Sequence, residues 1–190
     1  MTAHLLTDAD LDSNQWASCG PCSLAALFGR PLVDIHFAFP RQRVGRTWTS
    51  MLQMREALEA LRVRWSFTGL ARYKARVVPG DFRESLWPSR GIAHVQFRGS
   101  WDTLPMGHAA QLQRSHWIAV APAGHRVGDR WLTKPAVFDV NLVGLSGLEA
   151  QGGWTSREMW EREVSPMIAK SFGAKATGEW WVRAGIEITL

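Results

Sequence analysis

The chain has few cysteines: only Cys19 and Cys22 occur among its 190 residues. This scarcity excludes a disulfide framework, and in a reducing compartment a bridge between these two is not expected either. Their Cys-x-x-Cys spacing would suit zinc, but no second pair of ligands follows, so we expect no metal and no cofactor. A thioredoxin-like redox motif needs an apolar strand just before it, and residues 12–15 are polar. The remaining interpretation is a cysteine nucleophile with a cysteine neighbour.

Long apolar runs are also missing. No stretch of 18 or more apolar residues occurs, so no membrane span is expected. The first twelve residues are polar and acidic, without the basic start and apolar run of a secretory signal. We therefore expect a cytoplasmic protein, unless another system exports it or it is incorporated into a larger particle.

Basic residues are in excess but scattered. The net charge is +5, and the sequence isoelectric point is about 9.9. The densest basic stretches, at residues 41–46 and 62–76, match no motif that reads nucleic acid. We therefore expect no nucleic-acid partner, and only a mildly basic surface that attracts acidic partners.

The length suits one domain, 1–190, and turn and cap residues divide it into elements. An uncharged segment, 22–28, lies between Pro21, a suitable first helical residue, and Gly29, a suitable stop. Ser50-x-x-Gln53 resembles a capping box and opens a helix to Leu61. A further helix is predicted at 81–87, and a second capping box, Thr155-x-x-Glu158, opens a helix that runs to about Ser171. Strands are predicted at 63–67, 92–97, 116–121, 131–140 and 180–190. Helices come early and antiparallel strands late, which predicts an α+β fold.

The proposed nucleophile is Cys19, because the N-terminus of the helix that follows it carries partial positive charge and unpaired N–H groups that favour a thiolate. Of the six histidines, His116 is the best candidate for the base, since it begins an apolar strand. Asp139 and Asn141 end the next predicted strand, so either could orient the imidazole. Both would point to the same face of an extended strand, and we favour Asp139 because of its charge.

Residues 14–27, which include Gln15 and Cys19-Gly20-Pro21, resemble the nucleophile region of papain-fold cysteine peptidases of the bacteriocin leader-peptidase-like (double-glycine) branch. Residues 115–120 resemble the histidine strand of that branch, and 137–141 resemble its acidic position. The resemblance implies a papain-like cysteine peptidase fold and a peptide or protein substrate, for example a cell-wall peptide. It also implies that Gln15 and the backbone N–H of Cys19 bind the oxyanion.

Gln15 precedes Cys19 by four residues, which is closer than usual for that branch, and would suit a nucleophile at Cys22 instead. Eleven tryptophans favour core packing, but Trp16 and Trp117 flank the proposed catalytic residues and are candidates for lining a substrate groove. The sequence therefore predicts a cysteine peptidase or amidase. The alternative is an inactive papain-like domain that serves as a binding or structural module in a larger assembly.

Overall fold

The computed structural model describes residues 4–12, 18–39, 49–70, 86–104, 113–144 and 152–189. Gln15 and Trp16 lie outside these residues, as does most of the helix predicted at 81–87. Within the described part, no helix is long and apolar enough to cross a membrane.

The described residues in the first half of the chain form the helices α1 (Asp8–Asp12), α2 (Cys19–Phe28), α3 (Leu32–His36) and α4 (Met51–Ala60). Helix α2 ends as predicted at Gly29, whose positive φ of 58° is easy for glycine and lets its N–H reach the carbonyls of Ala25 and Ala26. Helix α4 begins with the predicted capping box, in which Ser50 and Gln53 satisfy each other's backbone N–H groups.

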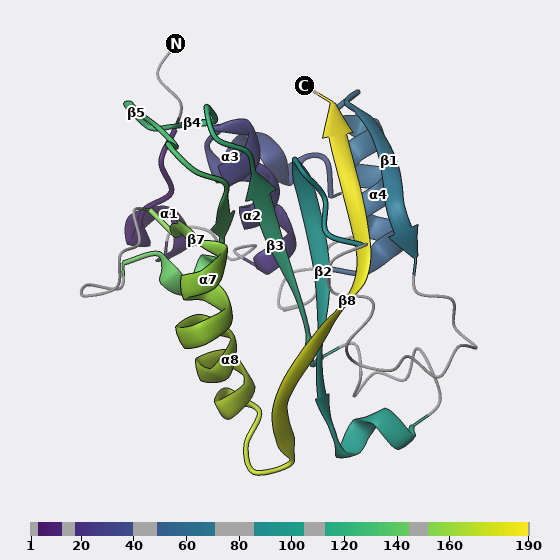
Figure 1. Cartoon of the computed structure of the whole chain (residues 1–190). Helices are drawn as coiled ribbons and strands as arrows, with labels where there is room; N and C mark the ends of the chain where they lie inside the picture. The colour runs from purple at the N-terminus through teal and green to yellow at the C-terminus, as the bar shows by residue number, and fades with distance from the viewer. Residues whose placement is uncertain are drawn as a thin grey trace.

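One antiparallel sheet of six strands, in the order β1-β8-β2-β3-β6-β7, forms the centre of the fold (Figure 1). The α+β prediction is confirmed. A separate two-stranded ribbon, β4–β5, extends from the connection between β3 and β6. The strands of both sheets are β1 (Arg64–Leu70), β2 (Gly91–Gly99), β3 (Ser115–Ala121), β4 (Arg126–Val127), β5 (Arg130–Trp131), β6 (Ala136–Phe138), β7 (Trp154–Ser156) and β8 (Ala176–Thr189).

Helices cover both faces of this sheet, so the protein has two cores (Figure 1). Successive side chains of a strand point to opposite faces, and in β3 Trp117 joins the core under α2 and α4, whereas Ile118 joins the core under the late helix. That late helix runs from α7 (Arg157–Met159) through a π-helical turn, η3 (Trp160–Val164), to α8 (Ser165–Ser171).

The strand predicted at 131–140 is wrong in its extent. The structure has β5 there, then β6 from Ala136, and a 3-10 turn, η2 (Val140–Leu142). Asp139 ends the extended backbone because its carboxylate accepts the N–H of Asn141 and caps this turn.

Two predicted helix starts are each displaced. Helix α2 begins at Cys19 rather than Pro21, which costs nothing because the N–H that proline lacks has no partner in a first turn. The late helix is capped by Ser156 rather than Thr155, because Thr155 pairs with Val137 in the sheet.

Candidate active site

Cys19 is the first residue of α2 and is partly exposed. The N-cap residue, Ser18, is extended and makes no side-chain cap to this helix. Its hydroxyl lies 3.5 Å from Oγ1 of Thr49 instead. The first N–H groups of an α-helix have no partner within the helix, so those of Cys19 and Gly20 give partial positive charge to the end of α2 at which Cys19 stands.

The start of α2 packs closely on the residue before the cap of α4. A Cβ on Gly20 would lie 2.4 Å from Oγ1 of Thr49, so only glycine fits there without a shift. The carbonyl of Thr49 accepts a 2.7 Å hydrogen bond from the indole of Trp117, and Ser23 of α2 donates to the carbonyl of Trp117. These contacts tie the start of α2 to strand β3.

Trp117 is therefore a structural residue in this fold. Its side chain is 1% exposed and stacks on His94 with ring centroids 4.3 Å apart. The prediction that Trp117 lines a substrate groove is wrong for its side chain, because the indole points into the core under α2.

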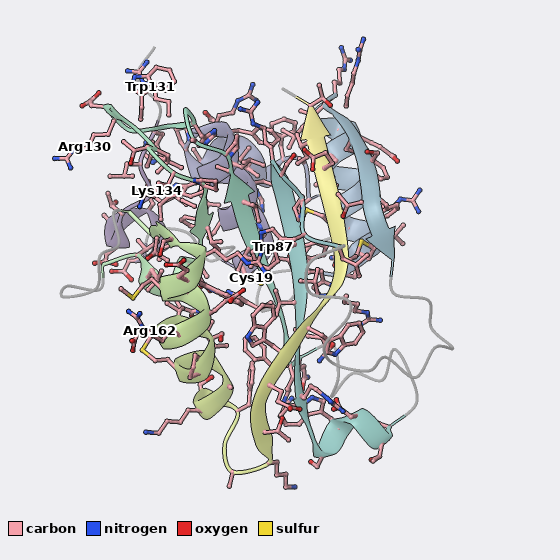
Figure 2. The ribbon with its side chains drawn as sticks, viewed as in Figure 1. Cys19, Trp87, Arg130, Trp131, Lys134 and Arg162 are labelled. Carbon is pink, nitrogen blue, oxygen red and sulfur yellow. The ribbon has the colours of Figure 1, made fainter. Side chains whose placement is uncertain are left out.

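The two cysteines lie in different surroundings. Cys22 is fully buried in the core, and burial, with a further effect of Cys19 and Asp10, raises the pKa of its thiol far above the ordinary range. A buried thiol of this kind is a poor nucleophile. Cys19 instead interacts electrostatically with His116 and is among the groups that raise the pKa of that imidazole. In Figure 2 it lies near the middle of the molecule, away from the exposed ribbon tip with Trp131.

His116 stands near the start of β3 and is 7% exposed. Its Nε2 lies 2.9 Å from Oδ1 of Asp139, so Nδ1 is the ring nitrogen that does not face this carboxylate. Burial acts to lower the pKa of His116, but the charges of Asp139 and Cys19 and the hydrogen bonds to both outweigh it. They raise the pKa to about 10, so the imidazolium is the favoured form at neutral pH.

Asp139 is completely buried and accepts hydrogen bonds on both oxygens. Oδ1 faces His116 and also accepts from the backbone N–H of Asn141 at 2.9 Å and from its side-chain amide at 3.0 Å. Oδ2 accepts from the indole of Trp160 at 2.7 Å. Burial acts to raise the pKa of Asp139, but His116 and these donors lower it below its usual value, so the carboxylate is ionised.

Asn141 takes a different place from the one its sequence position suggested. The backbone turns into η2 after Asp139, so the two residues do not share one face of an extended strand. The amide nitrogen of Asn141 lies 3.5 Å from Nε2 of His116 but 3.0 Å from Oδ1 of Asp139. Asp139 is thus the residue that contacts the imidazole, and Asn141 supports its carboxylate.

Trp160 is a residue of this site that the sequence analysis did not identify. It lies 21 residues from Asp139 in the chain and is one of eleven tryptophans, so no spacing rule singles it out. The only local signal was the predicted helix start at residues 155–158, one turn earlier.

His94 is the other buried histidine near the site, 2% exposed. Burial, with the charges of Arg183 and His116, lowers the pKa of His94 to about 3, so its ring is neutral. It contributes a neutral ring to the core rather than a second base.

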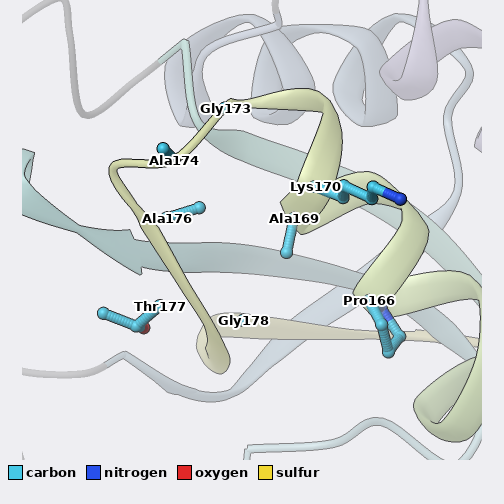
Figure 3. Close-up of a pocket in the computed structure, with 8 residues that line it drawn as sticks. All are labelled: Pro166, Ala169, Lys170, Gly173, Ala174, Ala176, Thr177 and Gly178. Carbon is cyan, nitrogen blue, oxygen red and sulfur yellow. The ribbon is translucent and has the colours of Figure 1, made fainter.

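A hollow of about 500 Å³ lies elsewhere, between the end of α8 and the beginning of β8 (Figure 3). Its lining residues, from Pro166 to Gly178, are mostly small and include none of the residues around Cys19. In Figure 1 these segments lie at the opposite end of α8 from α7. The hollow is therefore separate from the candidate active site.

The described residues contain no group of three His, Cys, Asp or Glu side chains that could hold a metal ion. The chemistry available at the site is that of an imidazole hydrogen-bonded to a buried carboxylate and in electrostatic contact with the Cys19 sulfur. Comparison with protein-family models, with curated proteins and with solved structures finds no significant match for the chain.

Proposed function

We propose that the protein is a papain-like cysteine peptidase or amidase in which Cys19 attacks the carbonyl of an amide bond. The observation that carries this proposal is the buried contact between His116 and Asp139, which leaves the second imidazole nitrogen to Cys19 at the start of a helix. A nucleophile, a base and an orienting group in this order are the features of an activated thiol.

The proposed reaction begins with a thiolate on Cys19 and a proton on His116. The Cys19 thiolate forms a bond to the substrate carbonyl carbon, and the oxygen takes the negative charge. His116 then donates its proton to the leaving amine as the C–N bond breaks, which leaves an acyl group on the sulfur. Neutral His116 next takes a proton from a water molecule, whose oxygen attacks the acyl carbon. The C–S bond then breaks and its electron pair returns to sulfur, which releases the acid and restores the Cys19 thiolate and protonated His116.

The oxyanion needs donors close to the sulfur. The backbone N–H of Cys19 lies at the start of α2 and is one donor in this proposal. Gln15, the second donor that the family resemblance implies, lies outside the described residues, and its role stays a prediction. Removal of one such donor typically slows the reaction by about a hundredfold or more.

The proposal is tested by thiol chemistry first and by hydrolysis second. The wild-type protein is treated with iodoacetamide at pH 7, and the modified cysteine is identified by peptide mass spectrometry. Fast labelling at Cys19, abolished in Cys19→Ala and kept in the matched control Cys22→Ala, is the expected result. The same three proteins are then incubated with a panel of peptide and cell-wall peptide substrates, and intact mass is used to detect an acyl group on Cys19.

Two outcomes would contradict the proposal. Equal and slow labelling of both cysteines would favour the inactive binding module, because nothing would then activate Cys19. Loss of labelling and of acyl-enzyme in folded Cys22→Ala would move the nucleophile to Cys22.

A further inference from the structure

Each oxygen of the Asp139 carboxylate has its own set of donors. Oδ1 faces His116 and Asn141, whereas the hydrogen bond to Oδ2 among the described residues comes from Trp160, at 2.7 Å. A carboxylate held on one oxygen alone could still turn about its Cβ–Cγ bond. The indole N–H on Oδ2 opposes that turn and keeps Oδ1 directed at the imidazole.

The position of Trp160 comes from an irregular helix. In η3 the N–H of Ser165 donates to the carbonyl of Trp160, five residues back, and Pro166 has no N–H for the carbonyl four residues before it. The hydroxyl of Ser165 donates to the carbonyl of Glu161 at 3.0 Å, which holds the wide turn. π-helical turns are frequent at functional sites.

Aromatic packing then fixes the indole ring itself. Trp160 is 0% exposed and meets Trp180 edge to face, with ring centroids 5.0 Å apart. The ring centroid of Trp87 lies 6.3 Å from that of Trp160 and 6.2 Å from that of Trp180, and the guanidinium of Arg157, which is also paired with Glu161, lies over Trp87. A ring enclosed in this way offers its N–H in one direction only.

We propose that Trp160 is a positioning residue of the active site, whose indole N–H holds Oδ2 of Asp139 so that Oδ1 orients His116. This inference rests on the proposed function, because it assigns Trp160 a role in preparing Cys19 for reaction. It adds a fourth side chain to the group of Cys19, His116 and Asp139.

The charged surroundings of Asp139 agree with this role. The titratable group that faces it from β3 is His116, and Cys19 of α2 acts through that imidazole. The hydrogen bond from Trp160 is one of the causes that lower the pKa of Asp139 against the effect of burial. The charges of Arg183 on β8 and of His116 both act on the neutral ring of His94 on β2.

The test compares Trp160→Phe, which keeps an aromatic ring but loses the N–H, with Trp180→Phe as a matched control in the same aromatic group. Three properties are measured: the carbon-13 titration of the Asp139 carboxyl, the pH profile of Cys19 alkylation by iodoacetamide, and the urea midpoint. In Trp160→Phe we expect the Asp139 titration to move to higher pH. We also expect alkylation at pH 7 to slow by about tenfold. Trp180→Phe keeps an aromatic ring against Trp160 and leaves the Trp160 N–H in place, so it should lower the urea midpoint and leave both pH-dependent properties as in the wild type.

A Trp160→Phe variant that loses stability but keeps the wild-type titration and alkylation profile would overturn the inference, since packing would then be the whole role of Trp160. The wild-type protein gives a second test that needs no substitution. Its Trp160 indole proton resonance should shift with the titration of Asp139 and His116, and the Trp180 resonance should not. A Trp160 resonance that stays constant through that titration would also overturn the inference.

These readouts separate the inference from the proposed function. The carboxyl and indole titrations report the contact between Trp160 and Asp139 whether or not any substrate is hydrolysed. Hydrolysis with an unaffected titration in Trp160→Phe would leave the peptidase proposal in place and reject only the role of Trp160.

Discussion

Removal of the Asp139 carboxylate is the most informative perturbation, because the structure makes it the main source of the positive charge on His116. In Asp139→Ala, burial continues to lower the pKa of His116 while the largest opposing charge is lost. We therefore expect this pKa to fall from about 10 towards the ordinary 6.5, with the Cys19 charge as the remaining support.

The size of the effect follows from the same shift. The interval from 6.5 to about 10 corresponds to roughly 5 kcal/mol, at about 1.4 kcal/mol for each unit of pKa. Because the pKa of His116 is raised in the folded state, this stabilisation is fully present below about pH 6.5 and is lost as the pH rises towards 10. The stability difference between wild type and Asp139→Ala should therefore be larger at pH 6 than at pH 9.

The assay is a nitrogen-15 titration of the His116 ring in the wild type, Asp139→Ala, Asp139→Asn and Asn141→Ala. Asp139→Asn keeps the shape of the side chain and removes its charge, so it separates the charge from the packing. Asn141→Ala should move the His116 titration much less, because its amide lies nearer to Oδ1 of Asp139 than to the ring. Turnover should likewise fall much more in the two Asp139 variants than in Asn141→Ala.

An unshifted His116 in Asp139→Ala would refute the reasoning about its charge. A shift in Asn141→Ala alone would exchange the roles of the two residues. If no variant moved the titration, the cysteine and histidine would act without a third member.

Three further predictions concern the helix that carries the nucleophile and its neighbour. Cys22→Ala should lower the free energy of unfolding by about 1–2 kcal/mol in urea titrations. In the wild type, Cys22 should be labelled only at the rate of unfolding, and fast labelling of Cys22 in the folded protein would contradict its burial. Gly20→Ala should cost about 1–3 kcal/mol and slow Cys19 alkylation, because the new Cβ would meet Thr49; an unchanged melting temperature and alkylation rate would refute this. Ser50→Ala should lower the free energy of unfolding by about 1 kcal/mol through loss of the α4 cap, with little change in Cys19 alkylation. Thermal unfolding followed by circular dichroism measures the loss of stability, and an unchanged melting temperature would contradict it.

Local order is what the sequence determined well. The capping box at Ser50 and the stop at Gly29 depend on backbone groups within four residues of each other, and both appear in the structure as predicted. The apolar strand that starts near His116 was identified for the same reason, since its continuous apolar run and its length are local properties. The α+β class follows from the order of such elements.

Local rules were insufficient where the backbone changes direction. The predicted strand at 131–140 ends early because the Asp139 side chain caps the turn that follows, and this altered the place of Asn141. Alternation along an assumed strand could not separate the two residues, whereas the actual turn does.

Tertiary structure decided which side chains of the site meet and which are buried. Antiparallel pairing of β3 with β6 brings His116 and Asp139 together across 23 residues, and the packing of the late helix on the sheet brings Trp160 to the same carboxylate. Cys22 and Trp117 are buried because α2 packs on β3. Contacts of this range depend on how whole elements pack, and neither residue type nor spacing in the chain encodes them locally.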